Sequence, residues 1–131
     1  MSQENTESLR PRLYHLKRFS LEQGYGFSLK KEINSLYAIV DNVEASSPAD
    51  RAGLKIGDLL IEVNYYNVYG ESLKDIMKII RYGLEVENDN TLEHEVIILV
   101  VDQATCDYYK NSNIRIHSTI DNALKIEILS N

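Results

Sequence analysis

The 131-residue sequence predicts a mainly β fold: an antiparallel sandwich or partial barrel of five to six strands, capped by a short helix and a longer one. Short runs of alternating or β-branched residues recur along the chain between turn residues, which is typical of strands. Within the first 102 residues only two helical patterns interrupt them, too few for a parallel, doubly wound sheet. The wholly apolar run Val96–Val101 predicts a central strand that is buried on both faces.

The chain before the first helix is expected to form three strands. Side chains alternate over residues 12–19, which predicts the first strand. The runs 27–33 and 36–43 are also strand-like, and Asn34 and Ser35 between them suit a turn. These two runs therefore predict a β-hairpin.

The first helix carries signals at both ends. Ser47 suits the helix cap, Pro48 suits the first helical position, and Gly53 suits a left-handed end. Two short strand candidates, residues 59–64 and 65–69, follow it around a turn.

The second helix is longer. Ser72 can cap it, with Asp75 three residues on as a weak capping box, and it should run to about Tyr82 and end at Gly83. Residues 83–95 are polar and acidic, and we expect them to form a loop before the apolar central strand.

These elements divide the chain into three parts. Residues 1–8 are polar and unpatterned, which predicts a disordered leader. Residues 9–102 are expected to form the folded domain. Residues 103–131 form a C-terminal extension that should begin with a short helix over 103–111. The rest of this extension either docks on the domain or acts as a partly ordered linker.

Composition argues against several function classes. The net charge of −6 disfavours a nucleic-acid binder, which needs a basic face for phosphates. The longest apolar run has six residues, far short of the ~20 of a membrane-spanning helix, and no signal peptide is evident. The single cysteine, Cys106, excludes an internal disulfide and fits a reducing compartment. We therefore expect a soluble intracellular protein that does not insert into membranes.

Catalytic chemistry is not evident in the sequence. His15, His94 and His117 are scattered and lack the spacing of metal ligands. No serine lies in a recognised nucleophile motif. We expect no metal, no cofactor and no enzymatic activity.

The second helix has more apolar surface than one core contact requires. Leu73, Met77 and Ile80 fall on one face at 100° per residue, and Ile76 and Ile79 fall on an adjoining face. Spacing alone leaves two interpretations open. The residues form one broad core stripe, or Ile76 and Ile79 pack inward while the other three line a binding surface.

The stretch QGYGFSLKKE, residues 23–32, supports the second interpretation. A glycine-flanked turn can point successive N–H groups into one concavity that suits a carboxylate. If the strand beginning at Phe27 lies at a sheet edge, its free backbone groups form a template for an added strand. With the apolar helix face opposite, this arrangement would capture an extended peptide by its C-terminus.

Two motifs identify a family when taken together. The first is GYGF, Gly24–Phe27, and the second is SPADRAGLKIGDLLIEVN, Ser47–Asn64. With both at this interval, the chain resembles the PDZ family over residues 12–102. The stretches RPRLYHLKRF, GYGFSL and VVDQATCDYYK further resemble NHERF-type scaffold PDZ domains.

The resemblance implies an interaction module that binds C-terminal peptides by β-augmentation, within a scaffold or adaptor for membrane or signalling proteins. Such a module would lie in the cytoplasm, at the inner face of the plasma membrane through its partners. The backbone amides of Tyr25, Gly26 and Phe27 would bind the peptide carboxylate. Lys17 or Arg81 would add a water-mediated charge.

The resemblance also assigns a peptide groove, whose residues would be Ser28, Leu29, Leu73, Met77 and Ile80. PDZ domains that select Ser or Thr two residues before the ligand terminus usually have histidine where this chain has Leu73. Leucine offers no hydrogen-bond partner, and burying a hydroxyl against it costs ~1–3 kcal/mol. An apolar-x-apolar terminus is therefore predicted. Asp41, where NHERF-type domains tend to have a basic residue, would favour Lys or Arg one or three places from the ligand's end.

Two departures from the family pattern affect local structure. Tyr65 follows the Val-Asn pair where the family often has glycine, so Asn64 is expected to take the left-handed turn conformation. The segment over residues 85–95 is longer and more acidic than is usual in PDZ domains. We expect it to be a solvated connection, and the alternative is that its negative charge steers the ligand.

A second function stays open. The chain could be a regulatory or structural PDZ-like domain whose groove is filled by its own tail or by a dimer partner. The sequence does not identify the partner, the oligomeric state or the number of further domains in a longer protein.

Overall fold

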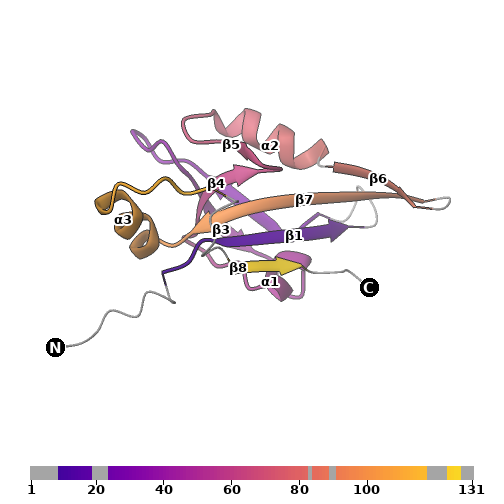
Figure 1. The fold of residues 1–131 in the computed structure, drawn as a ribbon. Helices are drawn as coiled ribbons and strands as arrows, with labels where there is room; N and C mark the ends of the chain where they lie inside the picture. The colour runs from indigo at the N-terminus through magenta and orange to yellow at the C-terminus, as the bar shows by residue number, and fades with distance from the viewer. Residues whose placement is uncertain (1–8, 19–23, 83, 89–90, 118–123, 128–131) are drawn as a thin grey trace.

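The computed structural model describes residues 9–18, 24–82, 84–88, 91–117 and 124–127. These residues form eight strands and three helices (Figure 1). The strands are β1 (Arg12–Arg18), β2 (Phe27–Lys30), β3 (Ala38–Val43), β4 (Leu59–Val63), β5 (Tyr66–Asn67), β6 (Leu84–Asn88), β7 (Thr91–Val101) and β8 (Leu124–Glu127). The helices are α1 (Pro48–Ala52), α2 (Leu73–Tyr82) and α3 (Gln103–Asn111).

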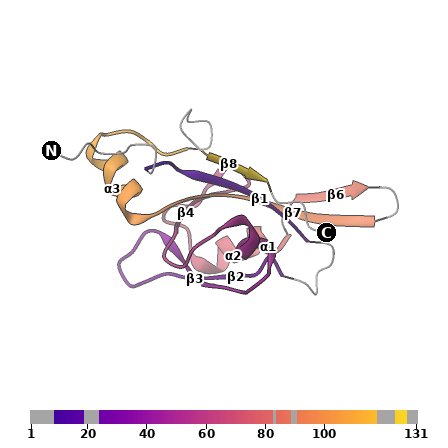
Figure 2. The same ribbon diagram turned by 90° about the horizontal axis from the view of Figure 1, so that it is seen from below.

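One sheet contains all the described strands, in the order β2-β3-β4-β7-β1-β8, with β5 paired to β4 and β6 paired to β7. The sheet curls, so that β2 and β3 lie across the core from β1 and β7 (Figure 2). Helix α2 covers one open end of this layered arrangement and α1 covers the other (Figure 1). The prediction of a mainly β, largely antiparallel fold with a short and a longer helix is confirmed.

Strand β7 is the centre of the sheet. It pairs antiparallel with β1 on one side and with β4 on the other, and its residues 94–101 are all buried. Ile98 faces a core cluster inside the curled sheet, whereas Leu99 faces a second cluster on the opposite side. Burial on both sides explains why this run is wholly apolar, as predicted.

Both predicted helix caps are confirmed. The hydroxyl of Ser47 accepts a backbone N–H from the first turn of α1 at 3.2 Å, and Gly53 ends the helix at φ 96°. The hydroxyl of Ser72 accepts the N–H of Asp75 at 3.1 Å. Helix α2 ends at Tyr82 as predicted, and the next residue, its predicted stop, lies outside the described residues.

The predicted hairpin is confirmed, but β2 and β3 are shorter than predicted because residues 31–37 form the connection. Asn34 has a φ of 69°, and the N–H of Ser35 donates to the carbonyl of Glu32 at 3.0 Å. Ile33, whose apolar side chain suggested a strand, is 93% exposed. The local turn therefore begins before the apolar pattern ends.

The prediction of an acidic loop over residues 83–95 is wrong for the described part of this segment. Strand β6 pairs antiparallel with the first half of β7, from Leu84 opposite Glu95 to Asn88 opposite Thr91. In the sequence, Leu84 and Val86 alternate with glutamates, which is the period of a strand. The alternation of apolar and acidic residues therefore predicts this segment better than its charge does. A strand accommodates such a sequence, because pairing satisfies the backbone N–H and C=O groups and alternate residues lie on opposite faces.

The turn after β4 is left-handed at two residues. Asn64 has a φ of 52°, as predicted, and Tyr65 follows at 68°. The side-chain carbonyl of Asn64 accepts the N–H of Ile97 at 2.9 Å, and the backbone N–H of Asn64 donates to the Ile97 carbonyl at 2.6 Å. The turn is thereby tied to the central strand.

The described parts of the C-terminal extension dock on the domain. Helix α3 forms where expected, and its cap Asp102 accepts the N–H of Thr105 at 2.7 Å. Strand β8 pairs in parallel with β1, from Leu124 beside Arg12 onward. These contacts of α3 and β8 are of the kind that the docked alternative requires. Residues 1–8, the predicted leader, lie outside the described residues.

Candidate functional site

Strand β2 lies at one end of the strand order, and β8 lies at the other. Among the described strands β2 pairs only with β3, so one side of its backbone has no ladder partner. The glycine-containing loop enters this strand directly at Phe27. The strand predicted to serve as a template is therefore an edge strand.

The loop before β2 is held by its carbonyl groups. The carbonyl of Tyr25 accepts the N–H of Ala49 at 3.0 Å, and the carbonyl of Gly26 accepts the N–H of Glu44 at 2.7 Å. Gly26 has a φ of 95°, which L-residues rarely adopt. Within the described residues, the N–H groups of Tyr25 and Gly26 donate no hydrogen bond. The two carbonyl groups thus hold the loop in place, and within the described residues the two N–H groups remain available to a ligand.

Arg18 is a residue of this region that sequence reasoning missed. Its guanidinium lies 4.6 Å from the centre of the Tyr25 ring, and its Nη2 donates to the carbonyl of Arg81 at 2.8 Å. Its side chain is buried, and its Nε has no hydrogen-bond partner among the described residues. A buried cation with an unused donor is costly unless an anion approaches it.

A sequence signal for Arg18 was present. In a strand, alternate residues share a face, so Arg18 lies on the same face of β1 as Leu16, which is fully buried. Arg18 is the last residue of this inward-facing row in β1, a position from which a long charged side chain can contact the loop before β2.

Burial raises the pKa of Tyr25, the residue under this guanidinium, to about 12, with Arg18 acting in the opposite direction. The phenol is therefore neutral at physiological pH.

The two predicted charged residues lie elsewhere. Lys17 faces the other side of β1, with its Nζ 3.9 Å from a carboxylate oxygen of Glu95. The side chain of Arg81 is exposed, and only its backbone carbonyl takes part in the Arg18 interaction. The structure therefore brings Arg18, rather than either predicted residue, into contact with Tyr25.

The predicted groove residues of β2 and α2 lie over one core cluster. Ile76 is fully buried in that cluster, as expected for the inward face of α2. Other apolar residues of the two elements are partly buried and pack against the same cluster: Phe27, Leu29, Leu73, Ile79 and Ile80. Met77 is 51% exposed and Ser28 is exposed. Apolar surface from both elements thus reaches solvent over a shared core.

Asp41 lies on β3 and is exposed. Its carboxylate is 3.9 Å from Nζ of Lys30, at the end of β2. This neighbouring cation partly offsets the charge with which Asp41 would attract a basic ligand residue.

The described part of the chain has neither a cluster of metal ligands nor a helix that could span a membrane. No three His, Cys, Asp or Glu side chains there gather in a way that could hold a metal ion. None of its helices is long and apolar enough to cross a bilayer. His15, one of the scattered histidines, contacts Glu95 instead.

Comparisons with known proteins agree with this fold. A family model described as "PDZ domain" matches residues 39–85. The chain is 41% identical over 99 residues to "Na(+)/H(+) exchange regulatory cofactor NHE-RF2" of Mus musculus, covering 76% of this chain and 26% of the relative. It is 28% identical over 120 residues to "Na(+)/H(+) exchange regulatory cofactor-like protein nrfl-1" of Caenorhabditis elegans, covering 92% and 24%. The chain thus spans about a quarter of the length of these relatives.

Two solved structures share the fold. The fourth PDZ domain of MUPP1 superposes with a TM-score of 0.54 at 25% identity, covering 70% of this chain and 74% of that one. The second PDZ domain of Dlg1 from the choanoflagellate Monosiga brevicollis has a TM-score of 0.56 at 16% identity, covering 71% and 99%.

Proposed function

Because the chain belongs to the PDZ family of protein-interaction modules, which are not enzymes, we propose that it binds the C-terminal peptide of a partner protein along the free edge of β2. The observation that carries this proposal is that the free edge of β2 begins directly at the end of the glycine-containing loop. Among the described residues, one side of β2 has no strand partner, and it starts where the N–H groups of Tyr25 and Gly26, which donate no hydrogen bond there, precede Phe27. An added strand would therefore end with its carboxylate at the loop.

Carboxylate capture combines dipoles and charge. The backbone N–H groups of Tyr25, Gly26 and Phe27 are the donors. Their hydrogen bonds to an ionised carboxylate would be about twice as strong as bonds to a neutral acceptor. Arg18 supplies the positive charge, since its buried guanidinium contacts the Tyr25 ring and keeps one donor unused. Lys17 and Arg81 remain secondary candidates for a water-mediated contribution.

Side-chain selection comes from the shared apolar surface of β2 and α2. The last ligand side chain packs among Tyr25, Phe27, Leu29, Met77 and Ile80. The side chain two places earlier points the same way in an extended strand and meets Leu73. Both positions should therefore be apolar, with Ser28 and Asp41 beside the ligand strand as weaker influences.

Affinity should be micromolar. Burying one large apolar side chain contributes about 1.5–3 kcal/mol, whereas ordering each backbone residue of a flexible peptide costs ~1–2 kcal/mol. The ordering cost offsets much of the gain from burial, which keeps a short peptide well short of nanomolar affinity. Binding near ~−8 kcal/mol, a micromolar dissociation constant, is the expected result.

The names of the relatives support a partner class. One is named as a regulatory cofactor of Na(+)/H(+) exchange, and another as a protein like such a cofactor. On that likeness we propose a role in a cytoplasmic scaffold that holds the C-terminal tails of membrane or signalling proteins near the plasma membrane.

The experiment is a titration with two hexapeptides that end in Val-x-Val and differ only in a free or an amidated terminus. The free peptide should bind with a micromolar constant, and the amidated peptide at least tenfold more weakly. Equal affinity for the two would refute carboxylate capture.

The alternative function, a groove filled internally or by a dimer partner, is tested by the same titration. One described part of the tail, β8, pairs with β1 at the opposite end of the strand order from β2. This placement gives no support to self-occupation by β8. A free peptide that binds only after dilution of the protein would favour a dimer-filled groove.

A further inference from the structure

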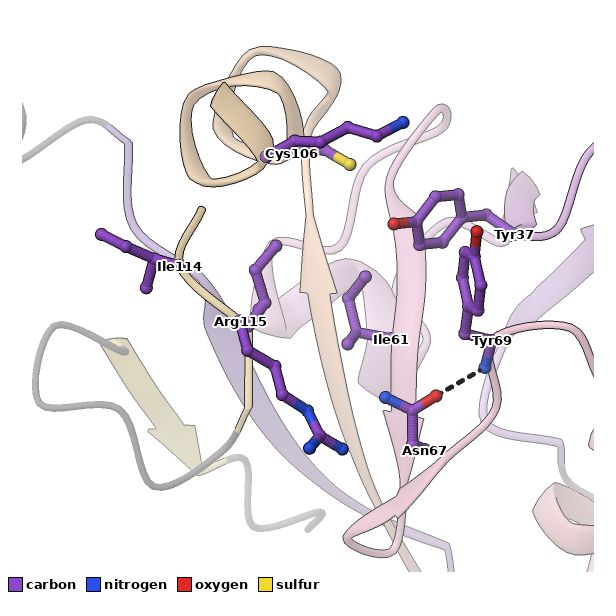
Figure 3. A pocket seen from close by; sticks show the side chains of 9 residues that line it. Tyr37, Ile61, Asn67, Tyr69, Cys106, Ile114 and Arg115 are labelled. Carbon is purple, nitrogen blue, oxygen red and sulfur yellow. Dashed lines mark hydrogen bonds between the residues drawn. The ribbon is translucent and has the colours of Figure 1, made fainter. Parts of the chain in front are cut away.

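The outer face of the sheet carries a pocket that the proposed function does not use. It lies between β4, β5 and the chain from α3 to residue 116, and its volume is about 220 Å³ (Figure 3). An apolar cavity of about 150 Å³ is large enough to bind benzene. The pocket therefore has room for one bulky side chain.

The inner walls are apolar and formed by packed residues. Ile61 of β4 and Cys106 of α3 are buried in the second core cluster, and Ile116 packs against it. Tyr37 and Tyr69 stand edge to face along one wall, with ring centres 4.9 Å apart and an interplanar angle of 68°. Such packed walls favour an aromatic or branched guest.

The rim extends this apolar surface outside the cavity. Tyr69 is 47% exposed and Ile114 is 46% exposed. The Oδ1 atom of Asn67 accepts the N–H of Tyr69 at 2.9 Å and holds that part of the rim (Figure 3). A ligand that continues beyond one buried side chain, as a peptide does, would cover both.

The charges at the pocket are positive, in a chain with a net charge of −6. Lys110 and Arg115 are the charged residues of its lining, which includes no Asp or Glu, and neither forms an ion pair within the described residues. Glu62, next to the lining residue Ile61, is buried, does not line the pocket and has an interaction of its own. Burial raises the pKa of Tyr37, so this phenol adds no negative charge.

We propose that this pocket is a second binding site, which takes an internal acidic–apolar segment of a partner protein. One bulky apolar side chain of the segment enters the cavity between Tyr37 and Ile61. Carboxylates next to it in the sequence pair with Lys110 and Arg115. Charge complementarity and the exposed apolar rim select this class of partner over a basic or a purely apolar one.

The site is independent of the peptide groove. The apolar residues of β2 and α2 pack against the inner core cluster, whereas the pocket belongs to the cluster on the other face of the sheet. Two partners could therefore bind one domain at once, one by its terminus and one by an internal segment.

The test uses the full 131-residue chain, labelled with ¹⁵N, and the peptide acetyl-Gly-Asp-Phe-Asp-Gly-amide. Both ends are blocked, so carboxylate capture at the groove does not contribute. We expect a dissociation constant below about 1 mM and amide shifts at Ile61, Asn67 and residues 114–116, but not at residues 24–29. Replacing both Asp by Asn, or Phe by Ala, should weaken binding about fivefold or more.

Matched variants assign the effect to the two cations. The double variant Lys110→Gln and Arg115→Gln should lose about fivefold in affinity for the acidic peptide. The control Arg51→Gln and Lys78→Gln changes the net charge equally at exposed positions of α1 and α2 that do not line the pocket, and it should bind normally. Both variants should keep their affinity for the free-terminus hexapeptide, which shows that the fold is intact.

The proposal would be overturned by shifts confined to residues 24–29, or by no shifts up to several millimolar peptide. Equal binding of the Asp and Asn peptides, or equal losses in the two double variants, would also overturn it. So would phenylacetate that binds as tightly as the peptide, because the occupant would then be a free acid and the rim would contribute nothing. Titration with the free-terminus hexapeptide tests the groove separately.

Discussion

Gly26 lies so close to Ser47 that a Cβ atom on the glycine would come within 2.0 Å of both the Cβ and the Oγ of the serine. Ser47 caps α1, and its hydroxyl also donates to the carbonyl of Glu44 at 2.7 Å. The loop before β2 and the start of α1 therefore form one tightly packed unit. The conformation of the predicted carboxylate loop depends on a helix more than twenty residues away in the chain.

Replacing Gly26→Ala should destabilise the protein and weaken peptide binding. The φ of 95° costs alanine about 1–2 kcal/mol, and overpacking against Ser47 costs about 1–3 kcal/mol more. Chemical denaturation measures the loss. Gly57→Ala is the matched control, because its φ is 98° but no atom lies within 4 Å of the added Cβ. Equal losses in the two variants would mean that the contact with Ser47 contributes nothing.

Arg18→Met should weaken binding of the free-terminus hexapeptide about tenfold while changing its amidated analogue little. In the proposed function the buried guanidinium beside Tyr25 acts on the ligand's charge, so its effect should disappear when that charge is removed. Lys17→Met and Arg81→Met are the comparisons, and each should lose less than threefold. Isothermal titration of both peptides against all three variants decides the matter. A larger loss in either comparison variant would return the role to the residue predicted from the sequence.

Leu73→His should shift preference toward threonine two places before the ligand terminus. The unaltered domain should favour Val over Thr there by up to tenfold, because a buried hydroxyl against leucine lacks a partner. Histidine restores that partner and should narrow or reverse the ratio. Two peptides that differ only in Val or Thr are titrated against the wild type, Leu73→His and the exposed neighbour variant Lys74→His. Tighter binding of the threonine peptide to the wild type would contradict this specificity.

Tyr65→Gly should stabilise the fold by up to about 1 kcal/mol. Tyrosine at a φ of 68° carries a left-handed strain of about 1–2 kcal/mol, and its side chain is 59% exposed, so little packing is lost. The greater flexibility of glycine in the unfolded chain offsets part of this gain. Thermal unfolding measures it, with Tyr66→Gly as the control within a strand, where destabilisation is expected. A loss of stability in Tyr65→Gly would show that its side chain makes contacts worth more than the strain.

Asp102 should make the anchoring of α3 sensitive to acid. Burial by itself would raise the pKa of its carboxyl, but hydrogen bonds from Thr105 lower this pKa below its usual value. A carboxylate with a lowered pKa stabilises the fold above the unfolded pKa, near ~4, and this contribution disappears as pH falls through the folded pKa. Asp102→Asn keeps a cap without the charge, whereas Asp102→Ala removes the cap at a cost of about 0.5–2 kcal/mol. The difference in stability between wild type and Asp102→Asn should be constant above pH 5 and vanish near pH 2. A difference that does not change with pH would contradict the assignment.

Local chemistry explains what could be read from the sequence. The caps at Ser47 and Ser72 depend on neighbours within a few residues, so their patterns are visible in one stretch of chain. The turn at Asn64 also has a local signal, although hydrogen bonds to Ile97 of the central strand help to hold it. The same is true of Val96–Val101, whose composition alone requires burial on both faces. Where two local patterns competed, as in the acidic residues of β6, alternation prevailed over charge, and the prediction of a loop was wrong.

By itself, the sequence determined the mainly β fold, both helix caps, the glycine-containing loop before β2 and the apolar face of α2, because periodicity and turn chemistry are local. Only the tertiary structure decided which charged residue meets Tyr25, since Lys17 and Arg18 differ by one position and strand alternation sends them to opposite faces. It also decided that β2 is an edge and that α3 and residues 114–116 enclose a pocket over β4. These features depend on contacts between segments far apart in the chain, where burial and packing choose among arrangements that local patterns leave equally possible.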